Sequence, residues 1–364
     1  MLLARAGHSV LLVDRVHMPS DTVSTHGLWQ AACVQLRRFG VLDAVAATGA
    51  APVDSTLLRI GDDEIELPLR PVAGVDRLYH PRRHALDGVL VDAARAAGAE
   101  VRTGVRVTDV VRDATGRVAG IETDAFRVPA RFVVGADGAG SRIAARVAAA
   151  AYDERPAAAA CTYAYFEDVE HRGTEFHFAT RGLQAGAFPT NDGQACAFVN
   201  MPVTEVPALR ADVEAGWWDR MRVAAPDLAG RLAGARRVGR FTGSPGHVSR
   251  FRVPYGPGWA LVGDAGYLKD PFSGHGITDA LRDAELLADA LHEVLAQGRD
   301  EQAALGAYHA LRDELSRPVY EATWKLASWQ WSPGDVMSVL GDLIAGIARE
   351  TAYLADRAER RAAA

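Results

Sequence analysis

The segment at residues 259–291, WALVGDAGYLKDPFSGHGITDALRDAELLADAL, constrains the fold of this chain more than any other feature. It has the pattern of an apolar strand, a glycine-rich turn and a long helix with apolar residues at helical spacing. Asp264 directly follows the strand, where it can accept hydrogen bonds from ligand hydroxyls, and the helix start adds about half a positive charge. An ordinary turn does not require the Gly-Asp pair, so the segment predicts a cofactor site. Its residues that suit sharp bends and close backbone approach are Gly263, Pro271, Gly274 and Gly276.

A second Gly-Asp turn lies at residues 131–147, RFVVGADGAGSRIAARV. An apolar strand runs into Asp137 and Gly138, and a helix opened by Ser141 follows. Glycines let the backbone approach a ligand, and a helix N-terminus presents free N–H groups to an anion. A generic strand–turn–helix can look similar, but Asp-Gly followed by Ser-Arg favours a second nucleotide contact.

A third element stands near the start of the chain, where the apolar run VLLV ends at Asp14. In a dinucleotide-binding unit, an acidic residue at the end of a strand accepts hydrogen bonds from ribose hydroxyls. A strand that ends in a solvated aspartate explains the same residues equally well.

The order of the predicted elements indicates a mixed α/β fold. Helix and strand patterns alternate in the first part of the chain and return toward its end, which is typical of a Rossmann-like sheet with helices on its faces. Residues 162–201 instead contain short strands rich in aromatic and β-branched residues, which predict an inserted antiparallel sheet. The expected units are a discontinuous nucleotide-binding domain at 1–60, 80–150 and 245–300, a sheet domain at 61–79 and 151–244, and a helical segment at 301–364.

The three motifs together resemble those of FAD-dependent monooxygenases built like para-hydroxybenzoate hydroxylase. That superfamily also includes reductases of the geranylgeranyl type and flavin-dependent halogenases. The resemblance extends from Leu2 to the end of the long helix, with the motifs in the same order and at similar spacing. The FAD-binding residues that it implies are Asp14, Arg83, Asp137, Gly138, Gly263, Asp264, Pro271, Gly274 and Gly276.

The resemblance also implies a role for each part of this set. Asp14 would hold the adenosine ribose, and the Asp137 turn would contact both FAD and a nicotinamide nucleotide. Asp264 would hold the ribityl and pyrophosphate region, and the glycines after Pro271 would lie beside the flavin. Arg83, in HPRRHALDGVL, would reach the cofactor phosphates, although a surface arginine is the simpler interpretation.

The opening strand and GxGxxG turn of that superfamily do not occur in the sequence. Met1 falls within the helix that should follow the turn, so we expect the true start to lie upstream. Otherwise this form would bind FAD weakly or not at all, because that turn normally receives the pyrophosphate. Loss of a central strand would also expose its neighbours in the sheet.

The resemblance implies that NADPH or NADH reduces the FAD, and that a flavin hydroperoxide then hydroxylates an apolar or aromatic small molecule. Two alternatives stay open: a flavin-dependent reductase or saturase of the geranylgeranyl type, and a truncated, non-catalytic binding protein. A halogenase is disfavoured because the sequence lacks WxWxIP. Aromatic residues on the expected sheet would line the substrate pocket or simply pack in the core: Tyr163, Tyr165, Phe176, Phe178 and Phe198.

The motifs that indicate FAD-binding residues do not identify a catalytic side chain. The candidates are His26, in STHGLWQ, and His275, which stands between two glycines. A lone loop histidine is ordinarily solvated, and packing or solvent contact explains His275 equally well. The sequence offers no Ser-His-Asp or Cys-His arrangement and no metal-ligand spacing, so we expect no metal site.

Composition narrows the class of partner. A net charge of −6 and the absence of a basic run argue against nucleic acid. Three cysteines without a CxxC pair favour a reducing compartment, and no apolar run is long enough to cross a membrane, so we expect a cytoplasmic protein. The helical spacing over residues 336–347 predicts packing on the core or on a second subunit, which leaves a homodimer open.

Overall fold

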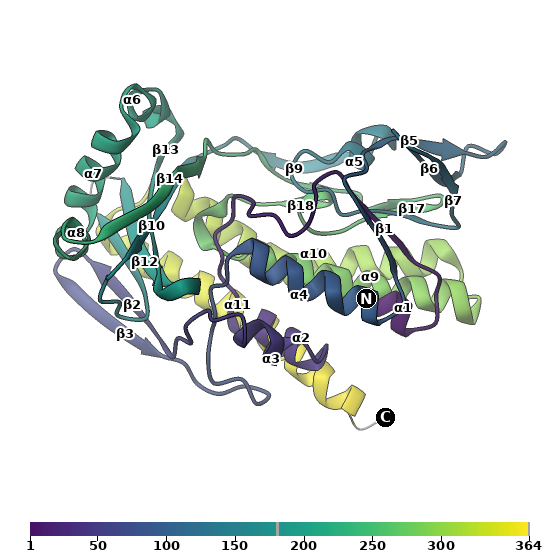
Figure 1. Ribbon diagram of the computed structural model, residues 1–364, viewed down its shortest axis with the longest axis horizontal. Helices are drawn as coiled ribbons and strands as arrows, with labels where there is room; N and C mark the ends of the chain where they lie inside the picture. The colour runs from purple at the N-terminus through teal and green to yellow at the C-terminus, as the bar shows by residue number, and fades with distance from the viewer. Residues whose placement is uncertain (180–181, 363–364) are drawn as a thin grey trace.

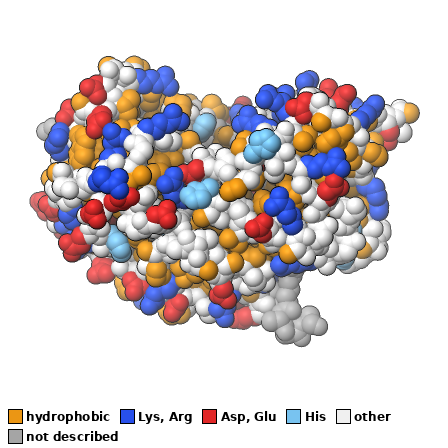
Figure 2. All heavy atoms as spheres, viewed as in Figure 1, with side chains coloured by type: hydrophobic (Ala, Val, Ile, Leu, Met, Phe, Trp, Pro, Cys, Tyr) orange, Lys and Arg blue, Asp and Glu red, His pale blue; other side chains and the backbone are white. Residues whose placement is uncertain are grey.

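The computed structural model describes residues 1–179 and 182–362, and residues 180–181 and 363–364, which belong to the expected sheet domain and helical tail, lie outside them. A large sheet with short helices forms one end of the molecule, several small sheets form the other end, and long helices run beneath both (Figure 1). The viewed face is notched between these two ends (Figure 2).

Two parallel strands carry the two Gly-Asp turns. β8 (Val133–Gly135) pairs in parallel with β17 (Trp259–Leu261), and the amide of Val262 donates to the carbonyl of Gly135 at 3.0 Å. Parallel strands end at the same edge of a sheet. The turns that follow β8 and β17 therefore lie together, although they are more than 100 residues apart in the sequence.

The start of the chain forms a second parallel pair. β1 (Leu11–Asp14) pairs with β4 (Glu100–Thr103), and four helices accompany the pair: α1 (Leu2–Arg5), α2 (Gln30–Arg38), α3 (Leu42–Ala46) and α4 (Arg83–Ala96). Among the described residues, β1 has no other strand partner, and all four of its residues are half-buried. Val134 of β8 is 37% exposed. In the described part of the chain, β1, β4 and β8 each have one edge without a strand partner.

Small antiparallel sheets surround these strands. One is made of β5 (Val107–Arg112), β6 (Val118–Thr123) and β7 (Arg127–Pro129). Another joins β9 (Ala151–Arg155), β15 (Ser249–Arg252) and β18 (Tyr267–Leu268). The short strand β16 (Tyr255–Gly256) extends the β8–β17 pair, and α5 (Arg142–Arg146) follows the first Gly-Asp turn.

The large sheet has seven strands in the order β14-β10-β13-β12-β11-β2-β3. Its strands are β2 (Ser55–Ile60), β3 (Asp63–Pro68), β10 (Ala159–Glu167), β11 (Thr174–Ala179), β12 (Leu183–Pro189), β13 (Ala195–Pro202) and β14 (Arg236–Ser244). The strands of the expected inserted sheet pair antiparallel, and the only parallel neighbours among the described strands of this sheet are β11 and β2. The parallel pair arises because β2 enters from an earlier part of the chain. The boundary expected between residues 60 and 61 falls inside the β2–β3 hairpin.

Helices cover both faces of this sheet. A core cluster joins strands β10, β12 and β13 to α6 (Val206–Ala211), α7 (Val213–Ala224) and α8 (Pro226–Ala233), and it includes the fully buried Trp217. On the other side, α10 (Glu301–Ala327) and α11 (Pro333–Ala362) pack with Leu58 and Phe178 of the sheet. The predicted long helix is α9 (Gly276–Gln297), which ends at Gly298 with φ 70° as expected. No helix of the described residues is long and apolar enough to span a membrane.

We predict that G258A destabilises the fold and displaces β17. Gly258 has φ +80°, and a Cβ there would lie 2.0 Å from the carbonyl oxygen of Val118. Strain and clash together should lower the free energy of unfolding by about 3 kcal/mol, measured by urea denaturation. The control is G230A in α8, where a Cβ meets nothing within 4 Å. That variant should gain up to about 1 kcal/mol in helix propensity. Equal stability of the two variants would contradict the prediction.

Candidate functional site

The first Gly-Asp turn is held by its own carboxylate. Asp137 accepts from the Ser141 hydroxyl at 2.5 Å and from the amides of Arg142 and Ile143 at 2.6 and 3.1 Å. These bonds satisfy orphan donors at the start of α5. Gly138 follows with φ +77°. The Asp137 side chain thus fixes the shape of the turn.

The second Gly-Asp turn presents a carboxylate that has no such partner. Asp264 is half-buried, and no described group donates a hydrogen bond to its side chain. Burial raises the pKa of Asp264, and the positive charges of Lys269, His247 and Arg83 oppose that effect. A half-buried acceptor without a donor is suited to ligand hydroxyls, because an unmet acceptor in this position is costly.

The glycines around these turns leave room for a flat ligand. A Cβ added at Gly138, Gly140 or Gly276 would meet nothing within 4 Å, and Gly263 and Gly274 adopt φ +54° and +64°. The carbonyl of Gly274 accepts from the indole N–H of Trp29 at 3.1 Å, which fixes its direction. Open backbone beside a free carboxylate fits a nucleotide such as FAD, so the residues present are compatible with that cofactor.

Pro271 and Arg83 occupy defined positions at this site. Pro271 starts a single 3-10 turn whose N-cap, Asp270, accepts from the amide of Phe272 at 3.1 Å. Arg83 opens α4 and makes a two-pronged ion pair with Asp87, at 3.0 and 2.9 Å. Because Arg83 also acts on the pKa of Asp264, the fold brings these two predicted residues near each other.

Asp14 stands apart from this group. It ends β1, and its Oδ1 accepts from the amide of Val16 at 2.7 Å, which is the geometry of an ordinary turn. No hydrogen bond or ion pair among the described residues joins Asp14 to either Gly-Asp turn. Its role toward a ribose stays a prediction.

The two candidate histidines are both buried, and neither is solvated as a loop histidine would be. His26 has φ 60°, its Nδ1 lies 2.8 Å from the Ser24 carbonyl, and its Nε2 lies 2.6 Å from the Tyr165 hydroxyl. Burial lowers the pKa of His26 to about 4, so the ring is neutral at pH 7. His275 is the N-cap residue of α9, and its Nε2 lies 2.5 Å from Glu350. Tertiary packing, which the local sequence does not show, encloses both rings.

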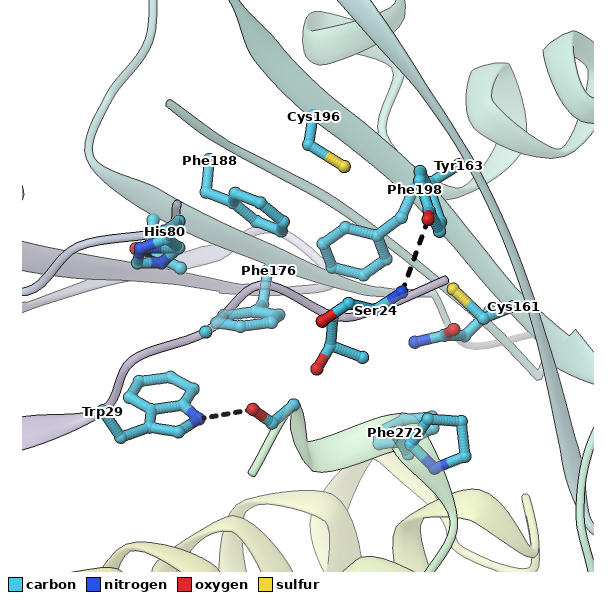
Figure 3. A pocket seen from close by; sticks show the side chains of 16 residues that line it. Ser24, Trp29, His80, Cys161, Tyr163, Phe176, Phe188, Cys196, Phe198 and Phe272 are labelled. Atoms are coloured by element: carbon cyan, nitrogen blue, oxygen red, sulfur yellow. Dashed lines mark hydrogen bonds between the residues drawn. The ribbon is translucent and has the colours of Figure 1, made fainter. Parts of the chain in front are cut away.

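A cavity of about 510 Å³, including its open mouth, lies between the seven-stranded sheet and the turn at Pro271. Figure 3 shows Phe176, Phe188 and Phe198 on the sheet side, with Trp29 and Phe272 opposite. The lining is mostly aromatic and apolar, which suits a flat apolar ligand. Its lining residues are Ser24, Thr25, Gly27, Trp29, His80, Cys161, Tyr163, Thr174, Phe176, Phe188, Cys196, Phe198, Asn200, Pro271, Phe272 and Gly274.

The aromatic residues expected at a substrate pocket divide into two groups. Tyr163, Phe176 and Phe198 line the cavity. Tyr165 does not, because its hydroxyl contacts His26 and its ring lies 4.1 Å from the guanidinium of Arg82. Phe178 packs against Phe272 in the core. Tyr163 and Tyr165 are two residues apart on β10, as are Phe176 and Phe178 on β11, so each pair points to one face of its strand. The cavity covers only part of that face, so both expected outcomes, pocket and core, occur.

Sequence reasoning missed several lining residues, above all Trp29, His80 and Asn200. Trp29 and His80 come from irregular segments whose position no periodicity reports. Asn200 had a usable signal, since it interrupts the apolar run of β13, AFVNMP, and a polar residue inside a buried strand needs a partner.

The strand pairing, the two Gly-Asp turns and the adjoining aromatic cavity define a flavin-binding oxidoreductase. The chain belongs to the family described as FAD binding domain, which matches residues 1–323.

The chain is also similar in sequence to individual curated proteins. The menaquinone reductase of Mycolicibacterium smegmatis is 26% identical over 311 residues, which cover 79% of this chain and 71% of that protein. Protein FixC of Escherichia coli K12 is 30% identical over 212 residues, 56% of this chain and 46% of FixC, so the match spans about half of that relative.

Solved structures share the fold. PqsL, a probable FAD-dependent monooxygenase from Pseudomonas aeruginosa, superposes with a TM-score of 0.79 at 20% identity, over 93% of this chain and 94% of that one. A geranylgeranyl bacteriochlorophyll reductase-like protein from Thermoplasma acidophilum gives 0.74 at 19% identity, over 99% and 94%. Flavin-dependent halogenases have the same fold. At these identities the likeness concerns the fold alone.

We predict that the buried histidines make the protein acid-sensitive. Burial lowers the pKa of His26 to about 4 and that of His80 to about 3, below the ordinary value of 6.5. Between these values the unfolded chain binds more protons, so stability is full above pH 6.5 and falls as the pH drops toward 4. Each histidine should remove about 2 kcal/mol from the free energy of unfolding between pH 7 and pH 5.

Urea denaturation at both pH values measures this effect. H80Q should lose about 2 kcal/mol less than the unaltered protein between the two pH values. H171Q serves as control, because His171 is exposed. The same pH response in all three proteins would show that His80 does not contribute.

Proposed function

We propose that this chain is an NAD(P)H-dependent monooxygenase that hydroxylates an aromatic or other apolar small molecule. One observation carries the proposal: the aromatic cavity is bounded by Pro271 and Gly274, in the turn that follows the free carboxylate of Asp264. A substrate in this cavity would lie next to the place proposed for the flavin. PqsL, which has the same fold, is named as a probable FAD-dependent monooxygenase.

The residues that would hold FAD follow from their positions. Asp264 would accept from ribityl hydroxyls, the turn at Asp137 and Gly138 would present backbone N–H groups, and Gly276 would lie against the ring. Arg83 would approach the phosphates, and Asp14 the adenosine ribose. Bound FAD supplies the electron transfer and oxygen chemistry that the side chains here lack. The chain's own residues would bind the cofactor, orient the substrate and keep water out of the site.

Two arginines support a phosphate-bearing reductant such as NADPH or NADH. Arg250 and Arg252 lie on β15, half-buried, and neither makes an ion pair with any described residue. Arg250 donates to the carbonyl of Ala139 at 3.0 Å, and Arg252 to that of Ala265 at 2.7 Å. Each guanidinium is thus attached to one of the two Gly-Asp turns, and uncompensated arginines there would attract phosphate groups.

The cavity also has a polar group that would orient a hydroxylated ring. Asn200 is 4% exposed, and its Nδ2 donates to Oε1 of the buried Gln184 at 2.5 Å. This bond fixes the amide and leaves Oδ1 without a partner among the described residues. A phenolic hydroxyl of the substrate would donate to that oxygen, and the aromatic walls would bury the ring.

D264N tests the cofactor site. Replacing the carboxylate by an amide should weaken FAD binding about tenfold or more, because a charged acceptor of hydrogen bonds is lost. Visible absorption of the purified protein, titrated with FAD, measures the affinity. D62N, at an exposed aspartate, is the control and should bind as before. Protein that takes up no FAD under any condition would instead favour a non-catalytic binding role.

N200L tests the substrate site without turnover. The variant should bind 1-naphthol about tenfold more weakly, while binding of 1-methoxynaphthalene, which lacks the donor, should change little. Quenching of Trp29 fluorescence reports binding, because Trp29 lines the cavity, and W29F assigns the signal. Equal losses for both probes would mean that Asn200 acts only through cavity shape. NADPH oxidation stimulated by such phenols under oxygen then tests the reaction.

A flavin-dependent reductase is the second candidate. The observation that favours it is the 26% identity, over most of the chain, to a protein named menaquinone reductase. The same cavity would accept a quinone or an isoprenoid double bond in place of a phenol. Product formation that continues without oxygen would establish this alternative and exclude the monooxygenase.

A further inference from the structure

The last helix of the chain carries a buried acid into the turn beside the proposed flavin position. Glu350 lies on α11, beyond the residues that the family matches, and is 1% exposed. It accepts from Nε2 of His275 at 2.5 Å and from Nη1 of Arg282 at 2.6 Å. We infer that Glu350 is a positioning residue, which fixes the flavin-side turn by holding the His275 side chain.

His275 connects Glu350 to the backbone of the turn. It stands between Gly274 and Gly276 and is the N-cap residue of α9, and its carbonyl accepts from the amide of Asp279 at 3.1 Å. The neighbouring glycines have no side chain to anchor them. A fixed imidazole therefore sets the direction of the N–H groups at the start of α9, which would face the cofactor.

Buried ion pairs also hold the start of this turn, at Lys269. Lys269 forms an ion pair with Asp279, and Arg282 bonds Asp279 and Asp283 at 2.9 and 2.8 Å. All of these side chains are buried. The segment from Lys269 to His275 is thus held at both ends by charged groups that water cannot replace, and such pairs are strongly destabilising to break on one side.

The buried carboxylates around this turn already have an arginine partner. His275, Asp279 and Glu350 bring three possible metal ligands within 4.8 Å of one another. Arg282, however, pairs with both carboxylates, and Lys269 pairs with Asp279, so groups of the protein already occupy the positions that a metal ion would take. Burial alone would raise the pKa of Glu350, but His275 and Arg282 hold it well below its ordinary value. Glu350 is therefore an anion, and its charge acts on the turn.

The inference rests on the proposed placement of the flavin beside this turn, and E350Q tests it. The matched control is E314Q, because Glu314 on α10 pairs with Arg349 of α11 at 2.6 Å on the surface. E350Q, but not E314Q, should speed amide hydrogen exchange at residues 274–279 about tenfold, a readout that needs no cofactor. It should also weaken FAD binding about tenfold. The midpoint potential of bound FAD should rise, because a negative charge near the reduced flavin is lost.

H275L provides a second route if E350Q fails to fold. Leucine has no hydrogen-bond donor, so this variant leaves Glu350 paired with Arg282 and removes the link to the turn. It should give the same local exchange and the same loss of FAD affinity. In the double variant the two losses should not add, since both break one connection. Unchanged exchange at 274–279 in E350Q and H275L, or effects that E314Q reproduces, would overturn the inference.

The proposed function fails separately from this inference. Probe binding in the cavity and oxygen-dependent product formation test the reaction, whereas exchange at the turn and the potential of bound FAD test Glu350. Normal phenol binding with altered exchange supports the positioning role alone. Faster exchange spread over the whole chain would show general loss of stability and would count against a specific role.

Discussion

The parallel pairing of β8 with β17 is the constraint on which the site depends. Hydrogen bonds between the strands fix Leu261 opposite Gly135, and the direction of pairing brings both following turns to one edge. The aspartate side chains of the two turns differ in their hydrogen bonds. Asp137 uses its carboxylate on the start of α5, while Asp264 keeps its carboxylate free of described donors. An acid that caps a helix and an acid without a described donor thus follow two adjacent strands.

The cavity is built between parts of the chain that fold around this pair. The sheet side supplies aromatic residues such as Phe176 and Phe198, and the turn side supplies Pro271 and Gly274. Trp29 connects them, since its ring stacks 6.3 Å from that of Phe176 and its N–H bonds the carbonyl of Gly274. If FAD binds as proposed, the apolar lining of this cavity would shield one side of it from water. Helix α11 contacts the same turn through the hydrogen bond between Glu350 and His275.

Much of the fold could be predicted because its signals are local. The strand ends at Gly-Asp, the stop of α9 at Gly298 and the short strands of the insert follow from glycine placement and from apolar spacing. The parallel entry of β2 beside β11 could not be predicted, because strand direction depends on how distant segments pack. β3 was also difficult, since most of its residues are exposed and its polar residues match a loop pattern.

The sequence by itself determined the class of cofactor site, because glycines and an aspartate at a strand end are required by backbone geometry and leave a local mark. It also determined which strands are rich in aromatic residues. Only the tertiary structure decided which of those aromatic residues face the cavity, and that His26 and His275 are enclosed. The free oxygen of Asn200 and the reach of Glu350 to His275 were likewise decided by packing. Burial and partner choice are properties of residues far apart in the chain, and no local pattern records which of them will meet.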